Sequence, residues 1–426
     1  MMQKFRIIAG SVRPGLGAGG VKSSSRSAAR RSLLPCVVLA RRAWGPAAHH
    51  PTARRATQST PELAALVKPM AGGARGGDDG PVAADLAVTY ARGVRLPYRD
   101  LPRAVRSWVE EQLGGPVITV EDRVGGFAPG CAAVLRTADR AGFVKATGSI
   151  PNAVALDLYR GERARLAALP DHPALPKPLA AEDLELPDQT WAVTLLPALP
   201  GEPPAHPWTE PVARLVLDRL GDLQTALVAA AGDERSSALP GSEHLARFFR
   251  PWSEVLDDPA DPWSAHPWVR DHATELQDSS ALLRSAVVGD VPVHADLRAD
   301  NVLVGRPATP GGQPPVWFVD WAAALRAAPW VDPMILACDV VTSRADRYQG
   351  GSVDVAGLLA SHPVTAAVDP ARRWAMMAGL ALTLHRLSQG ADPPGLPTIR
   401  GWQRRCAEDL LGFVRTVDLG SGRRLW

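Results

Sequence analysis

The chain has 426 residues, of which 46% are hydrophobic, so it can bury a large core and form two or three domain-sized units. Its four cysteines lie far apart, which excludes a disulfide-rich secreted scaffold and a zinc site made of close cysteine pairs, and we expect a cytoplasmic protein. The formal net charge is +3, but residues 1–70 carry twelve Lys or Arg and one acid; the remainder is therefore acidic, and the folded body is not expected to bind nucleic acid.

Residues 1–95 form a basic, Gly- and Ala-rich segment that we expect to lie outside the folded domains. We favour a disordered tail or upstream sequence translated from a wrong start, with Met70 as the true first residue. The alternative is a targeting segment or a nucleic-acid-binding arm. No apolar run approaches the roughly 18 residues that a membrane helix needs, so we expect no membrane span.

A small lobe over residues 96–200 is predicted to begin with a helix and a three-stranded meander. Apolar residues at helical spacing predict the helix over Leu101–Gln112. Three strand-like segments follow, separated by short turns: Val117–Val124, Cys131–Thr137 and Gly142–Ala146. Such short connections predict antiparallel pairing.

A second helix and a further strand pair complete this lobe. The helical pattern runs from about Asn152 to Leu169, where Pro170 ends it. The strand pair ends with Thr190–Leu196. Five proline and glycine residues between positions 197 and 204 then break the chain, which predicts a hinge before a second lobe.

The second lobe, residues 201–426, is predicted to be mainly helical. Its first helix starts after Thr209, a typical N-cap residue, and has an apolar face made of Val212, Leu215, Leu220, Leu223 and Leu227. Residues 250–268 are rich in Trp, Pro and Asp and are predicted to form a long excursion on the surface.

A hairpin and two long helices are predicted towards the C-terminus. The hairpin pairs Val302–Val304 with Val316–Val319 across a Pro- and Gly-rich loop. The helix over Arg372–Ser388 is apolar nearly all round and is therefore expected to be central. The last helix, Ile399–Val417, has one apolar face.

The strongest functional signal is an H-x-D-x4-N array from His294 to Asn301, followed by Asp320 at the end of an apolar strand. The chain has only two Asn, so chance rarely produces such an array. A hairpin places the start of one strand beside the end of its neighbour, so we expect Asn301 and Asp320 to lie close together.

These residue types suit phosphoryl transfer, which requires a positioned acceptor hydroxyl and neutralised phosphate charge rather than covalent chemistry by the protein. Asp296 is the candidate catalytic carboxylate, which accepts the hydroxyl proton or orients the hydroxyl. Asn301 and Asp320 offer the hard oxygen ligands that Mg²⁺ prefers. The alternative is that Asn301 is a turn residue and Asp296 a helix cap. For His294 we favour a structural role, in which hydrogen bonds hold the loop, over direct proton transfer.

With Asp320 in the place of the kinase metal-binding aspartate, this array resembles the aminoglycoside phosphotransferase family, whose relatives include choline and homoserine kinases. The resemblance spans about residues 100–420 and is specific at Val293–Asp320. It implies an α+β, bilobal protein-kinase-like fold, with an antiparallel sheet plus one helix in the small lobe and a mainly helical large lobe. The implied cofactors are ATP or GTP, and Mg²⁺.

The resemblance also implies site residues in the small lobe. Residues 124–130 resemble the loop that covers the nucleotide, whose glycines Gly125, Gly126 and Gly130 let backbone amides approach the phosphates. Lys145 matches the lysine that contacts the phosphates, and Glu162 matches its ion-pair partner.

Each of these residues also has a structural interpretation. The glycine segment resembles many ordinary hairpin loops, Lys145 is also typical of a surface strand, and Glu162 lies among arginines that favour a solvated helix face. Further along, residues 191–198 resemble the strand and linker that hold the adenine through backbone groups, mainly those of Leu196 to Ala198.

The sequence departs from the family pattern at two places. Asp300 stands where relatives usually carry a small or neutral residue, and Trp321 follows the metal aspartate where an acid is common; both leave metal affinity and nucleotide preference open. Asp332 matches the family's aspartate after the metal site, and we expect it to cap the next helix and steady the catalytic loop rather than take part in catalysis.

The predicted function is an ATP-dependent phosphotransferase that acts on a hydroxyl group of a small molecule. A cationic acceptor, such as an aminoglycoside-like antibiotic or an amino alcohol, is among the candidates, since acids at Glu254, Asp257, Asp258 and Asp261 offer a place for it. A solvated acidic loop explains them equally well. The alternatives are a regulatory pseudokinase and a protein kinase; the short segment between Asp320 and Trp330 argues against the latter.

Overall fold

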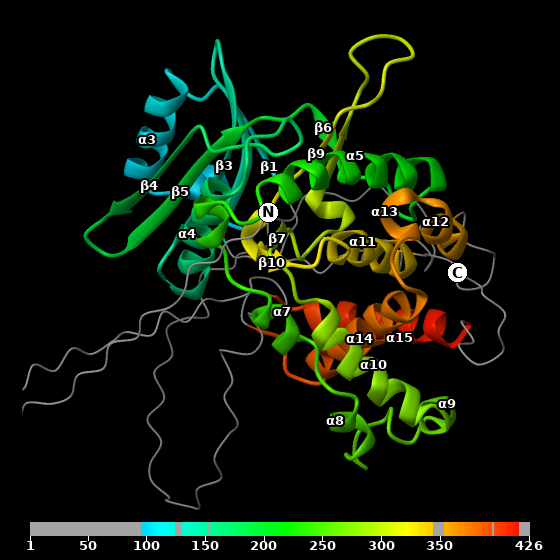
Figure 1. Cartoon of the computed structure of the whole chain (residues 1–426). Coiled ribbons are helices and arrows are strands. Elements are labelled where there is room, and N and C mark those ends of the chain that lie inside the picture. The colour runs from blue at the N-terminus through cyan, green and yellow to red at the C-terminus, as the bar shows by residue number, and fades with distance from the viewer. Residues whose placement is uncertain (1–94, 124–129, 151–152, 344–352, 394–395, 417–426) are drawn as a thin grey trace, which may run out of the picture. The chain divides into compact units, whose positions relative to one another are not determined.

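The computed structural model describes residues 95–123, 130–150, 153–343, 353–393 and 396–416 (Figure 1). The predictions for residues 1–94, including the start at Met70, lie outside this range. Among the described residues, no helix combines the length and hydropathy needed to span a bilayer.

The small lobe contains a five-stranded antiparallel sheet. Its strands are β1 (Thr119–Asp122), β2 (Cys131–Arg136), β3 (Ala141–Gly148), β4 (Ala180–Glu185) and β5 (Thr190–Pro197), in the order β1-β2-β3-β5-β4. The predicted meander is confirmed, since β1 pairs with β2 and β2 with β3, both antiparallel. The predicted first strand is longer at both ends than β1.

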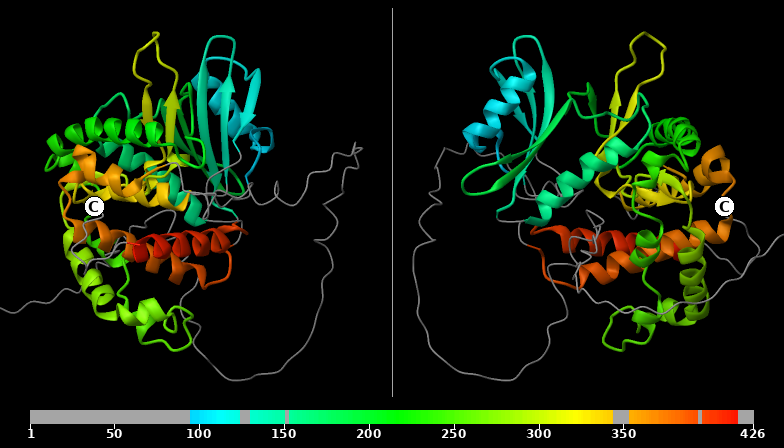
Figure 2. Two further views of the ribbon diagram at one scale, coloured as in Figure 1. Left: turned by 90° about the vertical axis from the view of Figure 1, so that its right-hand side faces the viewer. Right: turned by 60° about the vertical axis from the view of Figure 1, so that its left-hand side comes forward.

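Helices cover both faces of this sheet (Figure 2). Side chains of a strand alternate between its faces, so Val193 and Leu195 join the cluster that contains Val105 and Val109 of α3 (Arg103–Leu113). Their neighbour Ala192 clusters instead with residues of α4 (Ala153–Ala168). The two predicted helices are thus confirmed, and α4 lies on the face that carries Lys145.

The segment after β5 contributes a strand to a second sheet. β6 (Gly201–Glu202) pairs with β8 (Val302–Gly305), which pairs with β9 (Val316–Phe318), so the predicted hairpin is confirmed. The segment predicted as a hinge is therefore hydrogen-bonded to the large lobe.

The large lobe is mainly helical, as expected. It contains α5 (Glu210–Ala229), α6 (Glu234–Ser237), α7 (Glu243–Phe248), α8 (Ser253–Leu256), α9 (Pro267–Asp271), α10 (Ala273–Ala286), α11 (Val331–Thr342), α12 (Val355–Ser361), α13 (Pro363–Ala366), α14 (Pro370–Ser388) and α15 (Ile399–Thr416). A short strand β7 (Val291–Val293) pairs with β10 (Leu325–Ala327). The central position of α14 is confirmed, because it packs against α10, α11 and α15 and most of its side chains are buried.

Two predictions for this lobe need correction. On α5, Val212 and Leu215 are only partly buried, and the buried face is turned towards Ala213, Val216 and Leu217. Residues 250–268 do not form a surface excursion throughout, because the side chains of two tryptophans in this stretch, Trp252 and Trp263, belong to the large-lobe core. The prediction was wrong because the Pro and Asp content of this stretch indicated a surface position, although its tryptophans are buried.

Candidate active site

The H-x-D-x4-N array forms a compact loop that ends at the hairpin. Asp296 lies between β7 and the one-turn helix Ala299–Asn301. The side-chain amide of Asn301 donates to the backbone carbonyl of Asp296 at 2.8 Å, and the Val319 amide donates to the Asn301 carbonyl at 2.9 Å. These bonds join the loop to the end of β9, immediately before Asp320, so the hairpin brings the three candidate residues together as predicted.

The contacts of His294 fit the structural role that we favoured. Its Nδ1 accepts the amide hydrogen of Asp296 at 3.3 Å, so Nε2 carries the proton and donates to the Val319 carbonyl at 2.8 Å. The imidazole is buried beside Trp321, with ring centroids 4.7 Å apart. His294 therefore connects the loop of Asp296 to the strand of Asp320.

Backbone strain is concentrated in this loop and at Asp320. Among the described residues, Ala295 and Asp320 are the non-glycine residues with positive φ, each at 62°, a region that costs side-chain-bearing residues energy. Asp332 offsets part of that cost, because its carboxylate accepts from the amides of His294 and Ala295 at 2.8 and 2.9 Å. Asp332 does not cap α11, whose N-cap residue is Trp330.

Lys145 connects the two lobes. Its ammonium lies 2.5 Å from Glu162 Oε2 of α4 and 3.2 Å from Asp320 Oδ1. The side chains of Lys145 and Glu162 are largely buried, so the solvated face proposed as an alternative for Glu162 is not what the structure shows. The expected Lys145–Glu162 ion pair is present.

Electrostatics favour the charged forms of Lys145 and Asp320. Burial lowers the pKa of Lys145, but the carboxylates of Asp320 and Glu162 more than offset this, and the net pKa is raised. Burial favours the neutral form of Asp320, yet the Lys145 ammonium holds the pKa of Asp320 below its usual range. Burial raises the pKa of Asp296, against the opposing effect of Arg298, which makes its carboxylate a stronger proton acceptor.

A cleft of about 480 Å³ lies at this junction. It is lined by residues of both lobes, among them Val134, Phe143, Lys145, Leu196, Asn301 and Asp320. The guanidinium-bearing residues Arg95 and Arg123 also line it and were not predicted. A cleft that combines apolar walls with cationic side chains matches the two parts of a nucleotide, its base and its phosphates.

The glycine loop is described only in part. Gly125 and Gly126 lie outside the described residues. Gly130 is described, and a Cβ at this position would lie 2.7 Å from the Ala146 carbonyl oxygen. Close approach of β2 to β3 therefore requires glycine here, a structural reason that is independent of phosphate binding. Leu196 lines the cleft with Pro197 and Leu199, and the backbone role of Ala198 stays a prediction.

The donor set of the cleft suits Mg²⁺. Since Nδ2 of Asn301 donates to Asp296, Asn301 retains its amide oxygen as a ligand, and Asp320 supplies a carboxylate in the same cleft. Mg²⁺ is commonly held by one or two protein oxygens together with phosphates and waters. Among the described residues, no group of three or more His, Cys, Asp or Glu is arranged to hold a metal.

Asp300 lines the same cleft as Asn301 and Asp320, and its carboxylate is paired with an arginine. Its carboxylate accepts two hydrogen bonds from the Arg298 guanidinium, at 3.1 and 3.0 Å, and Arg298 lies over the Trp402 ring, 5.3 Å from its centroid. The unusual residue before Asn301 is therefore the partner of an arginine that the sequence analysis did not single out.

Asp339 of α11 was also missed. Its Oδ2 accepts from Trp208 Nε1 and from the Ala299 amide, both at 3.0 Å, so it ties the start of the large lobe to the loop of Asn301. The sequence around Asp339 does not indicate this role, because its two partners are 40 and 131 residues away along the chain.

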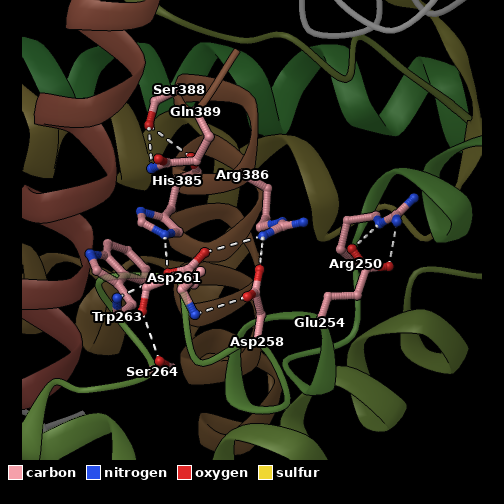
Figure 3. Close-up of polar contacts among 11 residues, drawn as sticks. Arg250, Glu254, Asp258, Asp261, Trp263, Ser264, His385, Arg386, Ser388 and Gln389 are labelled. Carbon is pink, nitrogen blue, oxygen red and sulfur yellow. Dashed lines mark hydrogen bonds and ion pairs between the residues drawn. The ribbon is translucent and has the colours of Figure 1, made fainter. Parts of the chain in front are cut away.

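The acidic residues considered for a cationic acceptor are mostly occupied (Figure 3). Asp261 is 5% exposed and accepts from His385 at 2.8 Å and from Arg386 at 3.1 Å. Asp258 lies 3.8 Å from Arg386, and Glu254 forms an ion pair with Arg250. Paired carboxylates attract a cationic ligand less strongly, so three of these four acids are chiefly structural, whereas Asp257 is exposed.

Comparison with known proteins agrees with the fold. The family model described as the phosphotransferase enzyme family (APH) matches residues 132–370, more than half of the chain, and the chain therefore belongs to this family. It is a small-molecule kinase with the bilobal protein-kinase-like fold, and it transfers a phosphoryl group to a hydroxyl group.

Solved structures similar to this chain are distant in sequence. A spectinomycin phosphotransferase in complex with ADP and spectinomycin is 14% identical, with a TM-score of 0.40 over 73% of this chain and 94% of that one. The GDP and kanamycin complex of APH(2")-IIia is 13% identical, with a TM-score of 0.47 over 73% and 96%. A microcompartment-associated aminopropanol kinase is 14% identical, with a TM-score of 0.39 over 70% and 94%. No curated protein matches the sequence.

Proposed function

We propose that this kinase uses Mg²⁺ and ATP or GTP to phosphorylate a small alcohol, with Asp296 as the catalytic carboxylate. The observation that carries the proposal is the contact between lobes, in which Lys145 of β3 lies 3.2 Å from Asp320. A cation and a metal-ligand carboxylate at one end of an apolar cleft are what a bound triphosphate requires.

Each side chain then has a defined task. Lys145 holds phosphate oxygens, and Glu162 fixes its position through their ion pair. Asp296 accepts or orients the proton of the acceptor hydroxyl, and burial, which raises its pKa, strengthens it as a base. Apolar residues of β2, β3 and β5, such as Val134, Phe143 and Leu196, form the walls that hold the base and sugar, with Gly125 and Gly126 as expected phosphate contacts.

Asn301 and Asp320 are the residues that hold Mg²⁺. When bound, the ion neutralises phosphate charge. Asn301 is oriented for this by its hydrogen bond to the Asp296 carbonyl, and Asp320 by the turn that its positive φ creates at the end of β9. These constraints reduce the cost of organising the ligands at the moment of binding.

The test replaces Asp296 with Asn, which keeps the shape and removes the base. We expect turnover of a phosphorylated alcohol to fall by about 100- to 10,000-fold, while nucleotide binding, measured by calorimetry, stays within a few-fold. Asp354→Asn is the matched control, because Asp354 is exposed and caps α12. Turnover by Asp296→Asn close to that of wild type would refute the assignment.

The acceptor is the less constrained part of the proposal. An aminoglycoside or an amino alcohol stays a candidate through the resemblance to the family. The acidic residues that favoured such a cation are paired with Arg250, His385 and Arg386, so they lend it little support.

A further inference from the structure

A second cavity opens beside Asp296 in the large lobe. Its walls come from α7, α11, α14 and α15, and they include Phe248, Ile335, Met376, Leu380, Leu384 and Trp402. Asp296 and Ala295 also line it, so the cavity reaches the candidate catalytic carboxylate, and it shares no lining residue with the nucleotide cleft.

The charged residues in this lining have partners within the protein, and Asp296 itself lies 3.7 Å from the Arg298 guanidinium. Arg298 makes two hydrogen bonds to Asp300 and lies over Trp402. Asp339 accepts from Trp208 and from the Ala299 amide. The remaining lining is aliphatic, aromatic or sulfur-bearing, apart from Thr342. A ligand that fills this cavity thus meets mainly apolar surface, interrupted by Asp296, Arg298, Asp339 and Thr342.

A cationic ligand is poorly matched to these walls. Desolvating an ammonium group is costly unless a free carboxylate receives it, and the two carboxylates of the lining already have partners, Asp296 near Arg298 and Asp339 with Trp208. Asp261 is buried between His385 and Arg386, whose side chains it already binds (Figure 3). An uncharged carbon skeleton gains free energy from the same surface.

We propose that the acceptor is an alcohol on an uncharged, apolar scaffold, whose hydroxyl reaches Asp296 while its carbon skeleton packs between α7, α11, α14 and α15. This inference rests on the proposed function. In the reaction, the hydroxyl proton passes to the Asp296 carboxylate, and the acceptor oxygen forms a bond to the γ-phosphorus. The bond between that phosphorus and the β,γ-bridging oxygen breaks, which leaves the nucleoside diphosphate.

The test compares two series of acceptors with the full chain, Mg²⁺ and ATP. The first is the alkan-1-ols from ethanol to octan-1-ol, and the second is the amino alcohols of equal length with a terminal ammonium. Each buried methylene is expected to raise kcat/KM about fourfold in the alkanol series until the cavity is filled. The amino alcohols, and kanamycin as a polycationic acceptor, are expected to be at least tenfold poorer than the alkanol of matched length.

Cavity variants separate specific binding from general hydrophobicity. Leu380 is partly buried and lines the cavity, so Leu380→Asp should abolish the dependence of kcat/KM on chain length and the saturation-transfer NMR signal of bound octan-1-ol. Val228→Asp is the control, because Val228 is an exposed hydrophobic residue of α5 outside the cavity. Phe248→Ser provides a second cavity variant if the first unfolds.

The outcomes are distinguishable. Preference for amino alcohols or kanamycin, or loss of the octan-1-ol signal only in the control, overturns the apolar acceptor and leaves the proposed function intact. Absence of phosphoryl transfer to every acceptor, with nucleotide still bound, overturns the proposed function and this inference with it.

Discussion

Removing Asp332 tests whether the strained loop of Asp296 is held by a single buried carboxylate. Asp332 is 1% exposed, and its two oxygens accept from the amides of Ala295 and His294 at 2.9 and 2.8 Å. Hydrogen bonds to a charged group contribute about 1.5–3 kcal/mol each. Asp332→Ala should therefore lower the free energy of unfolding by about 3–6 kcal/mol, a large part of the stability of a typical domain.

The conservative variant sharpens the prediction. Asp332→Asn keeps one acceptor oxygen but directs an amide donor at the second backbone N–H. We therefore expect its free energy of unfolding to fall by about 2–3 kcal/mol. Because Asp332 contacts the loop of Asp296 and does not line the nucleotide cleft, kcat should fall while KM for the nucleotide changes little. Urea unfolding followed by tryptophan fluorescence, together with steady-state kinetics, measures both effects.

The matched control is Asp354→Ala. Asp354 is an exposed N-cap residue whose carboxylate accepts from the Gly357 amide at 3.0 Å. Its replacement should therefore lower the free energy of unfolding by about 1 kcal/mol and leave kcat unchanged. If both Asp332 variants were as stable and as active as the control, the loop would be held by other contacts, and the reasoning would be wrong.

Two further predictions concern the linker and the small lobe. Burial lowers the pKa of His206 from 6.5 to about 4, so its contribution to stability is full above pH 6.5 and is lost as the pH falls towards 4. Over this window the loss is at most about 3 kcal/mol, and a pH series of urea unfolding should show it in wild type but not in His206→Gln. Gly130→Ala should lower the free energy of unfolding by about 1–3 kcal/mol, because its Cβ would lie 2.7 Å from the Ala146 carbonyl oxygen. Gly401→Ala, in an open helical position, should instead stabilise the protein by about 0.5–1 kcal/mol in the same assay.

Local sequence patterns determined much of the fold. The strands of the small lobe follow from short strand-like segments between turns, and α4, α5, α14 and α15 follow from helical periodicity and proline positions. The loop from Asp296 to Asn301 and its junction with Asp320 were also predictable. A hairpin is a local structure, and its pairing fixes which residues lie side by side.

The partners of the charged residues were decided only by the tertiary structure. Asp261 and His385 are 124 residues apart, and Lys145 and Asp320 are 175 apart, so no periodicity along the chain indicates that they meet. The same holds for residues 250–268, whose polar composition predicted a surface although Trp252 is buried in the core. Burial and ion pairing depend on what packs against a segment, and this is a property of the whole fold rather than of the segment.

The sequence by itself thus determined the class of chemistry, since the residue types and spacing that phosphoryl transfer requires lie within two adjacent strands and the loop before them. The tertiary structure decided the environment of that chemistry: Arg298 paired with Asp300, acids of residues 250–268 paired with α14, and an apolar cavity beside Asp296. The physical reason is that charge neutralisation and cavity walls arise from helices distant in sequence, which meet only when the core is packed.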